Sequence, residues 1–201
     1  SSGIARSLYQ ERSLRTSETS RGPSETGTSS ASKVQTVNDV RVRTMTSADL
    51  PAVGILAGRL VRAHHGYDPQ RFLEPVDPER GYARWFATQL DRDDTILLVA
   101  ADDDGIAGYV YARMEPRSYN ELLDACTKLH DIFVDDRVRR RGVGEALLRE
   151  TFRRAQEKGA PRVVLLTASQ NESAQRLFAR VGFRTTMLEM TREIGAADAT
   201  R

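Results

Sequence analysis

The stretch LHDIFVDDRVRRRGVG, residues 129–144, joins a predicted strand to a predicted helix and decides how the whole chain is interpreted. Leu129 to Val134 is a mostly apolar run of strand length, and apolar residues at helical spacing follow from Gly142 to Lys158. Two glycines open that helix behind three arginines. Glycine lets backbone N–H groups approach an anion closely, and the first turn of a helix carries unpaired donors and partial positive charge. The stretch therefore predicts a diphosphate-binding loop.

Other sites built around glycine or arginine fit this loop less well. A dinucleotide fingerprint needs a small residue where Leu147 stands, and a P-loop needs a Gly-Lys-Ser/Thr sequence that is absent. The arginines at 137–141 could contact nucleic acid, but Asp131, Asp135 and Asp136 flank them and no aromatic residue lies among them. We therefore expect no nucleic-acid partner. The remaining alternative is a solvated arginine run before an ordinary helix.

The rest of the chain predicts an α/β protein. Alternating or continuous apolar runs predict strands at residues 40–44, 96–101, 106–114, 129–134, 163–166 and 183–190. Apolar residues at helical spacing predict helices at 50–63, 79–90, 142–158 and 174–181. Residues 64–78 contain three prolines and predict a loop or broken helix. This order of elements predicts a mixed sheet with helices on both faces.

Composition bounds the class of protein. The 201 residues carry a formal net charge of +2, so no global field indicates a nucleic-acid or membrane partner. Residues 1–38 are rich in Ser and Thr, and we expect a disordered tail there, a domain at 39–194 and a flexible end at 195–201. Without a visible signal peptide or membrane span, we expect a cytoplasmic protein. Cys126 is the only cysteine, which excludes an internal disulfide and a cysteine zinc site, and we expect no metal.

A second element lies downstream of the diphosphate loop and carries a family resemblance. The predicted strand at 163–166 leads to Asn171-Glu172-Ser173-Ala174, then to Phe178 and to Gly182-Phe183. The order strand, Arg-x-x-Gly-x-Gly, helix, strand, Asn-x-x-Ala, helix, Gly-Phe resembles the GNAT superfamily of N-acetyltransferases over roughly residues 127–184. The resemblance implies acetyl-CoA as co-substrate. It also implies a single GNAT-like α/β (α+β) domain, with a mixed, mostly antiparallel central sheet of six to seven strands flanked by four helices.

The resemblance further implies which residues bind acetyl-CoA. The strand at 129–134 would separate from its neighbour and leave backbone groups free for the pantetheine arm, and the glycine loop would hold the pyrophosphate. The implied coenzyme-binding residues are Ile132, Phe133, Val134, Arg139, Arg140, Arg141, Gly142, Val143, Gly144, Glu145, Asn171, Ser173 and Phe178. Asn171 is equally a candidate helix N-cap, and Ser169 with Glu172 forms a rival capping box.

Acetyl transfer to an amine requires a base, an oxyanion donor and a way to release the thiolate. An ordinary ammonium is almost never free base at pH 7, so a general base is useful, and Asp131 and Glu115 are the candidates. A backbone donor at Val134 could hold the oxyanion. Members of the resembled family often carry a proton-donating tyrosine four residues before the Gly of Gly-Phe. Phe178 stands there instead, and Tyr111, Tyr119 and Ser173 are candidate substitutes.

By the same resemblance, the segment after the first helix shapes the acceptor site. Its candidate acceptor-binding residues are His64, His65, Asp68, Phe72 and Glu74. We predict an acetyl-CoA-dependent N-acetyltransferase that transfers the acetyl group directly to a primary amine of a small molecule or a protein. Cys126 has no surrounding motif that would lower its pKa for an acyl-enzyme. The alternative is a non-catalytic acyl-CoA-binding sensor or regulatory module, and the resemblance allows a homodimer.

Overall fold

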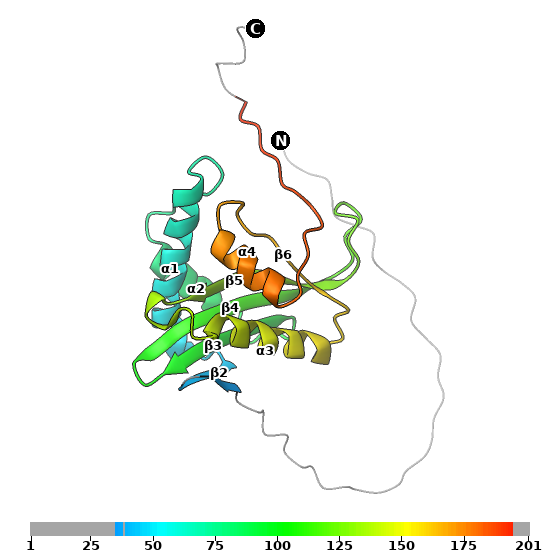
Figure 1. Cartoon of the computed structure of the whole chain (residues 1–201). Coiled ribbons are helices and arrows are strands. Elements are labelled where there is room, and N and C mark those ends of the chain that lie inside the picture. Colours follow the sequence, from blue (N-terminus) through cyan, green and yellow to red (C-terminus); the bar gives the residue numbers. More distant parts are fainter. Residues whose placement is uncertain (1–34, 38, 195–201) are drawn as a thin grey trace, which may run out of the picture. The chain divides into compact units, whose positions relative to one another are not determined.

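The computed structural model describes residues 35–37 and 39–194. The predicted disorder of residues 1–34 and the predicted flexible end at 195–201 lie outside the described residues. The described strands are β1 (Gln35–Val37), β2 (Val40–Thr44), β3 (Thr95–Asp102), β4 (Gly105–Glu115), β5 (Cys126–Val134) and β6 (Val163–Leu165) (Figure 1). The described α-helices are α1 (Leu50–Tyr67), α2 (Pro78–Ala87), α3 (Val143–Glu157) and α4 (Glu172–Arg180). None of these helices is both long and apolar enough to cross a lipid bilayer. The predicted mixed α/β fold with four flanking helices is confirmed.

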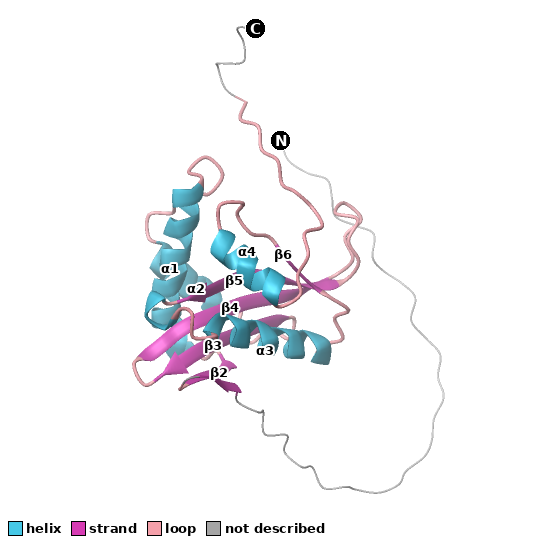
Figure 2. Cartoon of the chain, viewed as in Figure 1, coloured by secondary structure: helices cyan, strands magenta, loops and turns pink. Residues whose placement is uncertain are grey.

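The strands form one sheet in which spatial order follows chain order, from β1 to β6. The pairings from β1 to β5 are antiparallel, and β5 pairs with β6 in parallel. A parallel pair needs a crossover connection, and α3 supplies it. Figure 2 shows α3 and α4 together in front of the sheet. The side chains of α1 and α2 pack on the opposite face from those of α3 and α4.

Two apolar cores, one on each face, explain why β3 reads as a continuous apolar run rather than an alternating one. Ile96 and Leu98 pack with the residues of α3, whereas Leu97 and Val99 pack with those of α1 and α2. A strand covered on both faces needs apolar side chains at every position. Strand β5 lies two places from β3 in the same sheet, so its two faces also look toward different helix layers.

The predicted strand at 183–190 is wrong. These residues have no secondary structure, and Met187, Leu188 and Met190 are 76%, 80% and 91% exposed. β6 is therefore the edge of the described sheet and is only half-buried. Leu166, which was predicted to belong to this strand, lies beyond it and is 69% exposed. A β-prone segment forms a strand only where a partner ladder is available, and local sequence does not specify the partner.

Three further boundaries differ from the prediction. β1 lies within the predicted tail, because residues 35–37 pair with β2 across a turn at Asp39, whose φ is 67°. The helix predicted to end near residue 63 continues to Tyr67, so His64 and His65 lie on the last turn of α1 and not in a loop. α2 spans Pro78–Ala87 rather than 79–90, because proline is tolerated at the first helical position.

Candidate active site

The diphosphate loop adopts a backbone conformation that its glycines permit. Gly142 is the N-cap of α3 with a φ of 82°, in the left-handed region where a side chain is strained. The first intrahelical bond runs from the Ala146 N–H to the Gly142 carbonyl at 2.9 Å. The N–H groups of the first turn, before Ala146, therefore have no acceptor within the helix. At Gly144 an added Cβ would lie 2.9 Å from Leu177 Cδ2. The loop thus combines unpaired donors with a close approach of α3 to α4.

The arginines beside the loop have different partners. Arg137 forms two hydrogen bonds with Asp102, at 2.6 and 3.0 Å, and so ties the loop to the β3–β4 turn. Arg139 pairs with Asp136 at 2.6 Å and donates to the Val134 carbonyl at 3.2 Å. Two of the arginines that a nucleic-acid contact would use are therefore already paired with aspartates.

An arginine of α1 forms ion pairs with both acidic residues that precede the loop. Arg59 lies 2.7 Å from Asp135 and 2.9 Å from Asp136, which offsets charge that would repel a diphosphate. Arg140 and Arg141 are exposed beside Gly142. The sequence analysis missed Arg59, because no local pattern indicates a partner 76 residues away.

β5 loses one of its two partner strands halfway along its length. It pairs with β4 as far as Val134, but its pairing with β6 is confined to Thr127–Leu129. Within the described chain, the edge of β5 toward β6 therefore has no strand partner from residue 130 onward. A free strand edge offers backbone donors and acceptors to an extended ligand. Ile132, Phe133 and Val134 lie on this part of β5, and their coenzyme-binding roles stay predictions.

The three predicted coenzyme-binding residues at α4 have different environments: Asn171 caps the helix, Ser173 is exposed and Phe178 is buried. Asn171 is the N-cap, and its Oδ1 accepts a hydrogen bond from the Ala174 N–H at 3.2 Å. The rival capping box is absent, because the Ser169 hydroxyl bonds the Gln170 side chain at 2.9 Å instead. Ser173 is exposed in the first turn of the helix. The coenzyme-binding roles of Asn171 and Ser173 stay predictions.

Phe178 is 6% exposed and packs edge-on against Phe183, with ring centroids 5.7 Å apart. Phe178→Tyr is expected to keep or raise the rate of acetyl transfer, because the hydroxyl restores a proton donor for the leaving thiolate. It is expected to lower stability by about 1–3 kcal/mol if the buried hydroxyl finds no partner. Steady-state rates and thermal melting of the two proteins measure both effects. A loss of activity above about tenfold would show that a hydroxyl is not tolerated there.

Asp131 projects from β5 toward the α1 and α2 face. Tyr109 and Phe133 belong to the core on that face, and side chains two residues apart in a strand share a face. The Tyr109 hydroxyl donates a hydrogen bond to Asp131 Oδ2 at 3.4 Å. Burial raises the pKa of Asp131 to about 6, and the hydrogen bond from Tyr109 opposes part of that rise. The carboxylate is therefore ionised at pH 7 but more basic than an ordinary aspartate.

Two tyrosines near Asp131 stay protonated. Burial, with the charge of Asp131 as a smaller cause, raises the pKa of Tyr82 to about 12. The same two causes raise the pKa of Tyr109 well above its ordinary value. Neither phenol can act as a base near neutral pH, so the ionised carboxylate is the basic group among these three.

His130 is a site residue that the sequence analysis missed. The β4–β5 register shifts between Tyr111 and Ala112, which places His130 in a bulge. Its ring stacks on Tyr111 with centroids 5.0 Å apart, and its Nε2 lies 3.5 Å from Glu115 Oε1. Burial lowers the pKa of His130, and Glu115 opposes that change. Strict alternation would put His130 and Asp131 on opposite faces, and only the bulge brings both toward Tyr111.

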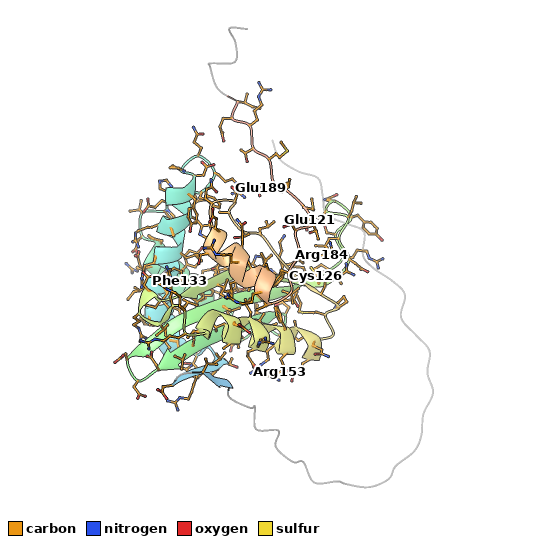
Figure 3. The ribbon with its side chains drawn as sticks, in the orientation of Figure 1. Glu121, Cys126, Phe133, Arg153, Arg184 and Glu189 are labelled. Carbon is orange, nitrogen blue, oxygen red and sulfur yellow. The ribbon has the colours of Figure 1, made fainter. Side chains whose placement is uncertain are left out.

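A cavity of about 540 Å³ lies beside this histidine–glutamate pair. The loop between β4 and β5 forms most of its wall, and Lys128 and His130 of β5 complete it. Figure 3 shows the location along β5: Cys126 and Glu121 lie toward one end of the strand, and Phe133 lies toward the other. Cys126 itself is 1% exposed, and burial raises the pKa of its thiol, which is unfavourable for a nucleophile.

The two predicted acceptor residues on α1, His64 and His65, contact predicted acceptor residues of the segment that follows the helix. His64 packs edge-on against Phe72 at 5.0 Å, and its Nδ1 lies 2.9 Å from the Leu60 carbonyl. His65 Nδ1 lies 2.8 Å from the Phe72 carbonyl, and its Nε2 is 3.7 Å from Glu74. These contacts order the end of the helix. An acceptor-binding role for these residues stays a prediction.

The turn after α1 is connected to the C-terminal segment. Asp68 caps the turn by accepting the Gln70 N–H at 3.0 Å. Arg71 forms an ion pair with Glu189, a residue of the segment that was predicted to be a strand (Figure 3). The ion pair joins two segments that lie 118 residues apart in the sequence, although neither side chain is buried.

A glycine loop at a helix N-terminus follows a strand with a free edge, and that strand also carries a basic carboxylate. The chain belongs to the acetyltransferase (GNAT) family, whose characteristic sequence matches residues 61–183. The resemblance seen in the sequence is confirmed.

Three relatives illustrate the similarity. An uncharacterized N-acetyltransferase of Methanocaldococcus jannaschii is 28% identical over 61% of this chain and 52% of its own length. A D-amino-acid N-acetyltransferase of Saccharomyces cerevisiae is 37% identical over 28% of this chain and 35% of its own. An aminoglycoside N-acetyltransferase in complex with coenzyme A is 20% identical, with a TM-score of 0.61 over 77% of this chain and 94% of that one. The chain thus spans about half or less of the two curated relatives.

Proposed function

We propose that the protein is an acetyl-CoA-dependent N-acetyltransferase that transfers the acetyl group directly to the primary amine of a small molecule or protein. One observation carries the proposal most strongly. The free edge of β5 leads toward the glycine loop, and the same strand carries Asp131 on the face that is turned away from α3. A diphosphate-bearing thioester that binds at the loop and the free edge can therefore reach an amine that binds beside Asp131 on the same strand.

The fit to the donor rests on the loop itself. The backbone at Gly142 and the space at Gly144 both exclude side chains, as a close-fitting diphosphate requires. The N–H groups of Val143, Gly144 and Glu145 supply donors, and Arg140 and Arg141 supply charge at the mouth. The fit is independent of the acceptor.

In the proposed reaction, the amine nitrogen forms a bond to the carbonyl carbon and the carbon–sulfur bond breaks. Asp131 accepts the proton that the nitrogen loses, directly or through water, because its pKa near 6 suits that role. A backbone N–H at Val134 stabilises the oxyanion. Glu115 with His130 is the competing base. The thiolate leaves with its electron pair and takes a proton from water, since Phe178 cannot donate one.

Direct transfer is proposed in preference to an acyl-enzyme. The buried thiol of Cys126, with its raised pKa, is poorly suited to attack a thioester. The relatives favour a small acceptor: one is named for D-amino acids and another for aminoglycosides. A non-catalytic acyl-CoA sensor is the second candidate, and Phe178 is the observation that favours it.

Acceptor-dependent release of the coenzyme A thiol tests the proposal. Acetyl-CoA is offered with amino acids, aminoglycosides, polyamines and lysine-containing peptides, and N-acetylated product is identified by mass spectrometry. We expect thiol release with at least one class of amine, at a rate that saturates with acceptor. Tight binding of acetyl-CoA with no acceptor-dependent release in any class would instead support the sensor.

A further inference from the structure

The cavity beside the loop that connects β4 and β5 is lined by equal numbers of acidic and basic side chains. Glu115 and Glu121 contribute two carboxylates to its wall, and Arg117 and Lys128 contribute two cations. A polyamine or aminoglycoside carries several ammonium groups and needs an excess of carboxylates around it. A wall with equal numbers of both signs instead complements a ligand that carries both signs.

Lys128 is placed to meet such a ligand. It stands opposite Arg113 in the β4–β5 register, and Asp131 stands opposite Tyr111 two pairs further along. Lys128 and Asp131 are three positions apart, which is at most about 10 Å along an extended strand and less across the bulge at His130. The long side chain of Lys128 and a small ligand can bridge that distance. His130, on the same strand between them, lines the cavity together with Lys128.

The ion pair that Lys128 already makes is easily exchanged. Its Nζ lies 3.5 Å from Glu121 Oε1, and the Glu121 side chain is 54% exposed. An exposed pair of this kind contributes at most about 1 kcal/mol. The carboxylate of a ligand can therefore replace that of Glu121. Arg117, which pairs with Asp124 at 2.9 Å, lies in the loop, whereas Lys128 lies on β5 with His130 and Asp131.

We infer that the acceptor carries a carboxylate near its amine, as amino acids do, and that Lys128 binds this carboxylate in the cavity while the amine lies toward Asp131. Lys128 is thus a specificity-determining residue, since it selects among amines without contacting the reacting atoms. The inference rests on the proposed function and adds the chemical class of the acceptor to it.

The test compares each amino acid, in both hands, with its own carboxamide, in which the carboxylate is neutral. The enzyme is saturated with acetyl-CoA, and thiol release gives kcat and KM. In wild type we expect the amino acid to be preferred. Lys128→Met is expected to raise the KM for the amino acid at least about tenfold, since a charged hydrogen bond is lost, with the KM for the carboxamide unchanged. The amine pKa values of the two substrates differ, and comparing their KM ratio in Lys128→Met with the same ratio in wild type cancels that difference.

Two variants control for charge and folding. Lys128→Arg keeps the cation and is expected to restore preference for the amino acid. Lys158→Met removes a lysine at the C-terminal end of α3 that does not line the cavity, and is expected to leave both KM values as in wild type. An equal fold change in KM for both substrates in Lys128→Met overturns the inference but leaves the acetyltransferase in place. No turnover of any amine overturns the proposed function itself.

Discussion

Valine in place of Gly142 is expected to weaken coenzyme A binding at least about 100-fold, since this is the loss of two charge-assisted hydrogen bonds. A β-branched residue at a φ of 82° is strained by roughly 1–2 kcal/mol or more, so the chain will shift toward negative φ. The shift moves the N–H groups of the first turn of α3 out of register with the diphosphate. Isothermal titration of coenzyme A measures the effect.

Gly144→Val is expected to weaken binding by a different route. Its Cβ would lie 2.9 Å from Leu177 Cδ2 and 3.6 Å from Val134 Cγ2. The Leu177 side chain must therefore move, and the added valine fills space next to the free edge of β5. Because this residue is helical and unstrained, a loss of affinity here is due to space and not to backbone conformation.

Gly159→Val provides the matched control for strain. Gly159 has a φ of 78°, close to that of Gly142, but it follows the other end of α3, and an added Cβ meets no atom within 4 Å. We expect the Gly142 and Gly159 variants to lose similar thermal stability, with coenzyme A affinity unchanged only in the Gly159 variant. If Gly142→Val binds coenzyme A as tightly as Gly159→Val, the diphosphate loop has been assigned wrongly.

The glycine loop could be predicted because its chemistry is local. Conformation at Gly142 and the open first turn of α3 depend on neighbouring residues, as does the N-cap at Asn171. The continuous apolar run of β3 likewise indicated burial on both faces. In each case the side chains and the structure that they specify lie within a few positions of each other.

The parts of the site that were missed depend on distant pairing. The ion pairs of Arg59 join α1 to the end of β5, and the bulge at His130 depends on how β5 meets β4. The segment at 183–190 has strand-like composition without a partner strand. Register and pairing are decided by the whole sheet, so no local pattern specifies them.

Asp131→Asn is expected to lower kcat about 100-fold or more, the range that a general base contributes. A base with a pKa of about 6 is active when deprotonated, so the wild-type rate should rise as pH increases through 6 and then level off. Asparagine keeps the size of the side chain but cannot take the proton. The pH dependence of kcat/KM, measured from pH 5 to 9, should lose its acid limb in the variant.

The same substitution is expected to stabilise the folded protein above pH 6. The pKa of Asp131 is raised from 3.8 to about 6 by burial, so the native state holds the proton more tightly than the unfolded state. Stability is therefore lost as pH rises from about 4 to about 6, by at most about 3 kcal/mol, and the loss is complete above that window. Asparagine carries no charge and avoids this cost. Its melting temperature should exceed that of wild type at pH 8 and match it at pH 4.

Opposite changes in activity and stability separate a catalytic carboxylate from a structural one. A carboxylate that stabilises the fold would lower both on removal, as loss of the buried partner of Arg43, Asp49, should do. Asp103→Asn, in the exposed turn after β3, controls for the charge change and should alter neither quantity. If Glu115→Gln removes the acid limb and Asp131→Asn keeps it, the base is the Glu115–His130 pair. If neither variant alters the profile, neither carboxylate is the base.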